Sequence, residues 1–87
     1  MIEKEIEVVN RAGIHTRPAS MIVKTSAKYK SDVYLMRDGF SINAKSIIGV
    51  MTLAAEQGAK LLIRADGPDE NEAVENLAQL FADGFGE

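Results

Sequence analysis

The feature that most restricts the fold of this chain is a change in the spacing of its apolar residues between segments 2–9 and 17–28. In the first segment apolar and charged residues alternate, which is typical of a β-strand with one buried face. That face would carry Ile2, Ile6 and Val8, opposite Glu3, Glu5 and Glu7. The second segment has helical spacing, and the predicted buried stripe is Ala19, Ile22, Val23, Ser26 and Ala27. A strand followed by an amphipathic helix is therefore expected.

Turn and capping residues set the limits of this helix and of a hairpin after it. Pro18 suits the first turn of a helix, where its missing N–H is not needed, and Thr16 is the expected N-cap. Asp38-Gly39 favours a tight turn between two strands predicted over residues 33–36 and 40–42. The middle of the chain therefore predicts a β-hairpin.

The residues after the hairpin predict a short helix and a further strand. The helix is expected to begin at Ser46 and to end at Gln57-Gly58. The apolar run from Lys60 is expected to be a central strand, with Leu61 and Ile63 pointing inward.

The last part of the chain predicts a third helix. Gly67-Pro68 ends the preceding strand, and Asp69 with Glu72 has the spacing of a capping box. Gly84 is a suitable residue to end the helix. The predicted buried stripe consists of Ala73, Val74, Leu77, Ala78 and Phe81.

The predicted order of elements is βαββαβα, and it indicates an α+β fold. We expect an open-faced two-layer β-sandwich, in which three helices cover one face of a four-stranded antiparallel sheet. A length of 87 residues suits one domain over residues 1–87 with one core.

The composition excludes several classes of protein. Cysteine is absent, which removes disulfides, thiolate nucleophiles and thiolate metal sites. The net charge is −3 without a basic tract, so we expect no binding to nucleic acid, which depends on clustered lysine and arginine. No apolar run approaches the roughly 20 residues that span a bilayer, and residues 1–10 do not have the pattern of a signal peptide. We therefore expect a cytoplasmic protein without membrane insertion.

His15 is the only histidine, and it lies in the turn before the first predicted helix. The first N–H groups of a helix lack intrahelical partners and lie at the positive end of the helix dipole, so they favour phosphate. His15 would accept a phosphoryl group whose oxygens bind the amides of Thr16 and Arg17. The Arg17 guanidinium would neutralise the charge of the phosphoryl group. Gly13 would permit an unusual backbone angle before the two amides.

Two other interpretations of His15 stay open at this point. A single histidine is more often an exposed or capping residue without a chemical role. A metal ligand is the weaker alternative, because one histidine and no cysteine leave only carboxylates as further ligands. We expect neither a metal nor a cofactor.

Two motifs together extend the argument to a known family. AGIHTRPAS, from Ala12, and KSIIGVM, from Lys45, resemble the histidine-containing phosphocarrier (HPr) family of the sugar phosphotransferase system. Their relative spacing, the chain length and the element order match that family over essentially the whole chain. Thr16 departs from the pattern, since many members carry alanine there.

The resemblance implies a phosphoryl carrier that is not itself an enzyme. In the family, phosphoenolpyruvate phosphorylates enzyme I, which transfers the group to the carrier histidine, and enzyme IIA domains receive it. His15 matches that histidine, which reacts through Nδ1, and Arg17 matches the arginine that steadies the phosphohistidine. A monomer is expected from the family and from the small size.

Ser46 matches a regulatory serine that an HPr kinase/phosphorylase modifies in some bacteria, where a transcriptional regulator is a further partner. The alternative is that Ser46 only caps the short helix. Both interpretations stay open.

A docking surface for partner proteins is expected beside the histidine. It consists of Ser20, Met21 and Lys24 on the first helix and Ile47, Ile48 and Met51 on the short helix. A rim of Arg17, Lys24 and Lys45 suits acidic partners. For Ile47, core packing is the alternative.

Two other functions compete with the phosphocarrier. One is a regulatory HPr-like protein that binds and controls other proteins and has no role in sugar transport. The other is an unrelated small α/β binding module with a structural histidine. The presence of both His15 and Arg17 favours phosphoryl transfer over either.

Overall fold

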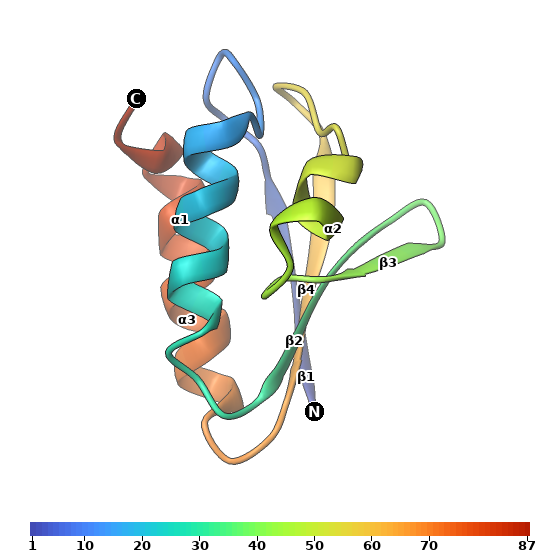
Figure 1. The fold of residues 1–87 in the computed structure, drawn as a ribbon, viewed down its shortest axis with the longest axis vertical. Coiled ribbons are helices and arrows are strands. Elements are labelled where there is room, and N and C mark those ends of the chain that lie inside the picture. Colours follow the sequence, from blue (N-terminus) through green and yellow to red (C-terminus); the bar gives the residue numbers. More distant parts are fainter.

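A computed structural model describes residues 1–87 and contains four strands and three α-helices in the predicted order βαββαβα (Figure 1). A short 3₁₀ turn, η1, follows the last helix over Gly84–Gly86. The other elements are β1 (Ile2–Glu7), α1 (Thr16–Ser26), β2 (Asp32–Arg37), β3 (Phe40–Asn43), α2 (Ile47–Thr52), β4 (Lys60–Asp66) and α3 (Glu70–Ala82).

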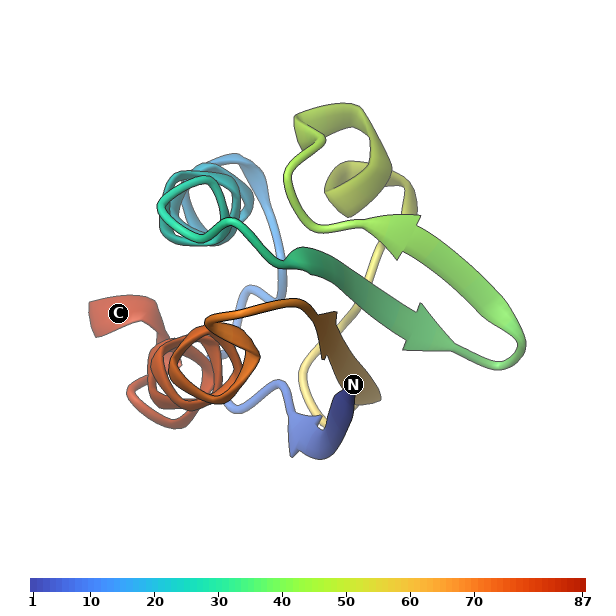
Figure 2. The same cartoon turned by 90° about the horizontal axis from the view of Figure 1, so that it is seen from below.

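The four strands form one antiparallel sheet in the order β1-β4-β2-β3. The helices lie on one face of this sheet and leave the other face open, as Figure 2 shows. Strand β4 is central, as predicted, because it pairs with β1 on one side and β2 on the other, and its residues Leu61, Ile63 and Ala65 are buried in the core. The predicted open-faced two-layer architecture is therefore confirmed.

The alternation in β1 separates the core from the open face of the sheet. Ile6 and Val8 are buried, whereas the glutamates at positions 3, 5 and 7 are exposed. Glu3 lies opposite Arg64 of β4, and its carboxylate accepts a 2.9 Å hydrogen bond from Arg64 Nε. This ion pair lies on the face that the helices leave uncovered.

The helices bury the stripes that their spacing predicts, with one exception. All five predicted residues of α3 are buried. In α1, Ala19, Ile22 and Ser26 are buried and Val23 is partly buried. Ala27, the C-cap residue of α1, is exposed, contrary to prediction.

The β2–β3 hairpin confirms the predicted turn. Asp38 and Gly39 both have positive φ, 50° and 82°, as the two central residues of a type I′ turn require. The helix after the hairpin is shorter than predicted. It ends at Thr52, because the chain turns at Ala54, whose φ of 47° is not right-handed helical.

The capping box predicted at the start of α3 is wrong. Asp69 is at the N-cap, but its carboxylate accepts hydrogen bonds from the N–H of Lys30 (2.9 Å) and from the N–H (2.9 Å) and Oγ (2.5 Å) of Ser31. These bonds, with the Ser31 hydroxyl as the largest cause, lower the pKa of Asp69 to about 2. The carboxylate thus ties α3 to the loop before β2, while Glu72 makes no hydrogen bond to the cap.

None of the helices is both long and apolar enough to cross a membrane.

Candidate functional site

The loop between β1 and α1 is held tightly against the segment before β4. Gly13 has a φ of 72°, and a Cβ atom built on it would lie 2.4 Å from the carbonyl oxygen of Ala55. The next amide, that of Ile14, donates to the same oxygen at 2.9 Å. The predicted need for glycine at position 13 is confirmed, and the close approach sets where the following residue lies.

His15 is the N-cap of α1. Its backbone is extended, and its carbonyl oxygen accepts the Ala19 N–H at 2.9 Å. Its side chain makes no capping bond and is 44% exposed. Thr16, predicted as the N-cap, is instead the first helical residue, because the extended conformation ends one residue earlier.

The first turn of α1 has the features of an anion site that the sequence predicts. The amides of Thr16 and Arg17 have no backbone acceptor, and no acidic side chain lies in this turn. Unpaired amides and the helix dipole both favour negative charge. Thr16 and Arg17 therefore begin the helix with free N–H groups beside the imidazole.

Glu87 contacts the imidazole directly. The His15 Nε2 atom lies 2.9 Å from one carboxylate oxygen of Glu87 and 3.2 Å from the other. Asn10, only 5% exposed, donates from Nδ2 to Glu87 Oε1 at 3.1 Å. The hydrogen bond from His15, with smaller contributions from Asn10 and Arg17, holds the pKa of the Glu87 carboxyl below its ordinary value.

Arg17 lies beside His15, and its guanidinium also faces the end of the chain. Its Nη1 atom donates to the Phe85 carbonyl at 3.3 Å and to Glu87 Oε2 at 3.4 Å. The side chain is 59% exposed. The structure thus brings Arg17 and His15 together around one shared carboxylate.

The sequence offered no indication of Glu87 at this site. It lies 72 positions from His15, and only the path of the chain after α3 brings the two together. Asn10 lies in the turn before His15, and its amide also donates to the Gly13 carbonyl at 2.8 Å. A lone polar residue in a turn does not reveal such a contact.

Ser46 is the N-cap of α2, as expected for the start of the short helix. Its Oγ accepts the Gly49 N–H at 3.2 Å, and its carbonyl accepts the Val50 N–H at 2.9 Å. The hydroxyl is only partly buried.

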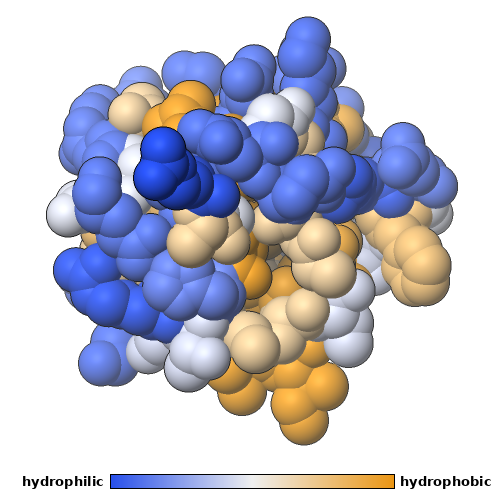
Figure 3. All heavy atoms as spheres, turned by 90° about the horizontal axis from the view of Figure 1, so that it is seen from above, coloured by the Kyte–Doolittle hydropathy of each residue, from blue (hydrophilic) through white to orange (hydrophobic).

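The expected docking residues lie on adjacent helices, since α1 packs against α2. Ile48 is 74% exposed, Ile47 42% and Met51 41%. Core packing is therefore wrong for Ile47. Figure 3 looks onto the end of the molecule where α1 begins and shows apolar surface gathered along its lower edge. On α1, Ser20 and Met21 are partly buried and Lys24 is exposed.

Lys45 does not join the predicted rim as a free charge. Its Nζ donates to the Tyr29 carbonyl at 2.8 Å, which holds the ammonium group in the loop after α1. Arg17 and Lys24 are the exposed cations of the rim.

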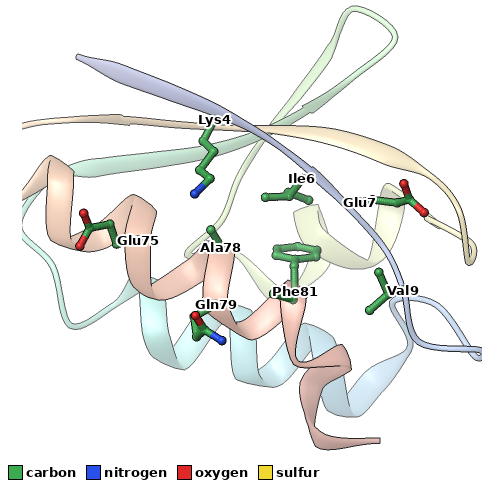
Figure 4. Close-up of a pocket in the computed structure, with 9 residues that line it drawn as sticks. Lys4, Ile6, Glu7, Val9, Glu75, Ala78, Gln79 and Phe81 are labelled. Atoms are coloured by element: carbon green, nitrogen blue, oxygen red, sulfur yellow. The ribbon is translucent and has the colours of Figure 1, made fainter.

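A separate groove lies between β1 and α3, where Ile6 and Phe81 face each other (Figure 4). Lys4 extends from the edge strand toward α3, and no residue of the His15 site lines this groove. No three histidine or acidic side chains come close enough together to hold a metal ion.

The comparisons with known proteins agree with one another over nearly the whole chain. A family model described as "PTS HPr component phosphorylation site" matches residues 2–83. Phosphocarrier protein HPr of Treponema pallidum (strain Nichols) is 44% identical over 87 residues, which are 100% of this chain and 99% of that protein.

Two solved structures from Thermoanaerobacter tengcongensis are similar to this chain. The crystal structure of HPr-C-His has a TM-score of 0.96 at 41% identity and covers 100% of this chain and 98% of that one. The crystal structure of an HPr dimer has a TM-score of 0.81 at 41% identity and covers both chains completely.

Proposed function

Because the chain belongs to the HPr family of the phosphotransferase system, we propose that it carries a phosphoryl group on His15. The group comes from phosphorylated enzyme I and goes to enzyme IIA domains during sugar uptake in the cytoplasm. As a member of this family the protein is a phosphocarrier and not an independent catalyst. It is left phosphorylated when it accepts the group, and it must pass the group on before it can accept another.

The observation that carries this proposal is an exposed imidazole at the N-cap of a helix with unpaired amides. His15 is open to a partner, and the free N–H groups of Thr16 and Arg17 lie in the first turn behind it. A helix terminus stabilises a nearby negative charge by about 0.3–2 kcal/mol. Such moderate stabilisation suits a carrier, because a phosphoryl group held too tightly would not move on.

The chemistry is an exchange of one bond to phosphorus for another. The lone pair of His15 Nδ1 forms the new N–P bond, while the bond from phosphorus to the donor breaks and its electron pair stays on the donor. The phosphoryl oxygens bind the amides of Thr16 and Arg17. The Arg17 guanidinium leaves Phe85 and Glu87, its present partners, and pairs with the phosphoryl group.

We propose that partners dock on an apolar patch beside His15, formed by α2 and the adjoining face of α1. The exposed side chains of Ile47, Ile48 and Met51 provide apolar area that the fold does not use. Ser20, Met21 and Lys24 continue the patch on α1. Arg17 and Lys24 beside it favour partners with an acidic surface.

Ser46 is the proposed site of regulation by an HPr kinase/phosphorylase. Its hydroxyl caps α2, directly before Ile47 of the apolar patch. A phosphate on this hydroxyl would add close to two negative charges to the docking surface. We expect that change to weaken docking to an acidic partner such as enzyme I.

The working form is proposed to be a monomer, since a carrier that alternates between partners needs its histidine face free. A related protein from Thermoanaerobacter tengcongensis has been crystallised as a dimer. Light scattering coupled to size exclusion distinguishes the two forms by mass.

Incubation with phosphoenolpyruvate and purified enzyme I tests the carrier function. Intact mass should increase by one phosphoryl group at neutral pH, and acid should remove it, because N–P bonds are acid-labile. The His15→Ala variant should gain nothing. A wild-type protein that stays unmodified beside an enzyme I proven active on another carrier would refute the proposal.

The docking surface has a natural control in Phe40. Phe40 is 72% exposed, almost as much as Ile48, but it lies at the hairpin on β3. Ile48→Glu should slow the transfer from enzyme I, whereas Phe40→Glu should leave its rate unchanged. Equal effects of the two substitutions would contradict the proposed location.

A further inference from the structure

The backbone of β1 is unpaired along one edge of the sheet. This strand pairs with β4 alone, because the strand order is β1-β4-β2-β3. The Val8 amide donates at 2.9 Å to the carbonyl oxygen of Ala59, which lies on the β4 side. Hydrogen-bonding directions alternate from one residue to the next along a strand, so the amides of Glu5 and Glu7 point toward the free edge. These amides can pair with the backbone of an added strand.

The groove between β1 and α3 lies beside this free edge. Its volume is about 600 Å³, within the range of ligand-binding clefts. Ile6, Ala78 and Phe81 line its floor, and Val9 at one end is 46% exposed (Figure 4). Alternate side chains of an added strand would enter the groove and remove this apolar surface from water.

The charges around the groove decide which kind of segment fits it. The one ion pair that β1 makes joins Glu3 to Arg64, so the carboxylates of Glu5 and Glu7 have no cationic partner. Helix α3 contains no lysine or arginine and presents Glu75 to the groove. A strand that carries lysine or arginine beside the glutamates of β1 is therefore complementary to this side of the molecule.

A second copy of this chain fits the edge poorly. Pairing of two β1 strands would bring the glutamates of one copy beside those of the other, and like charges on adjacent strands are destabilising. Lys4 restricts the occupant further, because it extends from β1 toward α3 and lines the groove (Figure 4). A lysine on an edge strand discourages indiscriminate pairing. An accepted segment therefore needs an acidic residue at the position that faces Lys4.

We propose that the free edge of β1 binds an extended segment of another protein, in which lysine or arginine alternates with apolar residues and an acidic residue faces Lys4. The segment continues the sheet beyond β1. Its basic side chains lie beside Glu5 and Glu7, and its apolar side chains enter the groove against α3. No residue of the His15 site lines this groove, so the partner can bind while His15 exchanges phosphoryl groups.

A synthetic peptide tests this assignment. The probe is a short capped peptide in which lysine alternates with leucine and one leucine position carries glutamate. Titrated into the nitrogen-15-labelled protein, it should shift the amide signals of β1 and α3 in a saturable way and leave those of α2 unchanged. Hydrogen exchange at the Glu5 and Glu7 amides should slow about tenfold when the peptide is at about ten times its dissociation constant, because these amides then donate to the peptide backbone.

Matched variants separate the groove from general charge attraction. Glu5→Lys should weaken peptide binding about three- to tenfold, the scale of a surface charge pair that is lost and reversed. Asp32→Lys makes the same change in net charge at an exposed position on β2, which β4 separates from β1. It should leave the affinity unchanged. A peptide with the same residues grouped in blocks should bind more weakly, because it lacks the alternation of a strand with two different faces.

The residue that faces Lys4 is tested by a double substitution. Replacement of the peptide's glutamate by leucine should weaken binding to the wild type but not to Lys4→Ala, because only the wild type then leaves an ammonium group without a partner in the groove. Equal weakening in both proteins would show that the glutamate does not face Lys4.

The proposal is overturned by an absence of saturable shifts in β1, by equal loss of affinity in Glu5→Lys and Asp32→Lys, or by unchanged exchange of the Glu5 and Glu7 amides in the complex. Slower exchange of these amides with rising protein concentration, without peptide, would make a second copy the occupant and would also overturn it. None of these measurements uses enzyme I, so their outcome is separate from that of the carrier function. Thermal unfolding confirms that the variants compared are folded.

Discussion

Replacement of Gly13 by alanine should lower the free energy of unfolding more than the same substitution at another glycine with a positive φ angle. Two effects add at this position. An alanine at a φ of 72° costs about 1–2 kcal/mol relative to glycine. Its Cβ would also lie 2.4 Å from the Ala55 carbonyl oxygen, well inside the 3.0 Å below which real Cβ contacts essentially do not occur.

Relief of this contact requires the loop to separate from the segment before β4. The hydrogen bond from the Ile14 amide to the same carbonyl oxygen would stretch or break, at a cost of about 1 kcal/mol. The sum for Gly13→Ala is therefore about 2–3 kcal/mol. Because His15 follows two residues later, the loop movement should also slow phosphoryl transfer.

Gly39→Ala separates the two effects. Gly39 has a φ of 82°, but a Cβ atom there would meet nothing within 4 Å. We expect about 1–2 kcal/mol of destabilisation from the backbone angle alone. For a domain of this size 1 kcal/mol lowers Tm by about 4–8 °C, so the extra cost of about 1 kcal/mol should make Gly13→Ala melt roughly 4–8 °C below Gly39→Ala.

The assay is thermal unfolding by circular dichroism for the wild type and both variants, with transfer from enzyme I measured below the melting range. Equal Tm values for Gly13→Ala and Gly39→Ala would falsify the argument, since the close approach to Ala55 would then have no energetic weight. Normal transfer by Gly13→Ala would show that His15 does not depend on this loop position.

Three further substitutions test other parts of the structure. Asp69→Asn should destabilise the protein at neutral pH, and the difference in free energy of unfolding from wild type should be lost as pH falls from 3.8 toward 2, because the folded state lowers the pKa of Asp69. Urea unfolding at a series of pH values measures this difference. A difference independent of pH would contradict the prediction. Ser46→Ala should cost about 1 kcal/mol through loss of the α2 cap, measured by urea unfolding with Ser41→Ala, exposed on β3, as control. Arg17→Ala should slow phosphoryl acceptance about tenfold. Arg17→Lys should slow it less, because lysine keeps the positive charge but lacks the planar guanidinium. Initial rates of phosphorylation by enzyme I that match the wild type would show that Arg17 takes no part in the transfer.

The predictable parts of the fold are those that depend on local periodicity. Strand alternation and helical spacing placed the elements and selected the buried faces, because a residue's side follows from its position within a regular element. The Asp38-Gly39 turn was also predictable from the local sequence, because few residues tolerate two successive positive φ angles. The ends of helices were less predictable. α2 stops at Thr52, and nothing local distinguishes Ala54 as the residue that turns the chain.

Side chains that act outside their own element were not predictable. Asp69 has the spacing of a capping residue, yet its carboxylate bonds Ser31, because the fold brings a distant loop within reach and offers several donors at once. Lys45 was expected on the docking rim, but the Tyr29 carbonyl binds its ammonium group. In both cases a contact with a distant segment replaced the role that the sequence predicts.

The sequence by itself determined the α+β order of the elements and the presence of His15 and Arg17 at the start of a helix. Both follow from spacing along the chain, which is visible without coordinates. Only the tertiary structure decided what surrounds the imidazole. The burial of Phe85 against Phe81 turns the chain after α3 so that Glu87 reaches His15, 72 positions away. No periodicity encodes such a contact, because it depends on how the elements pack.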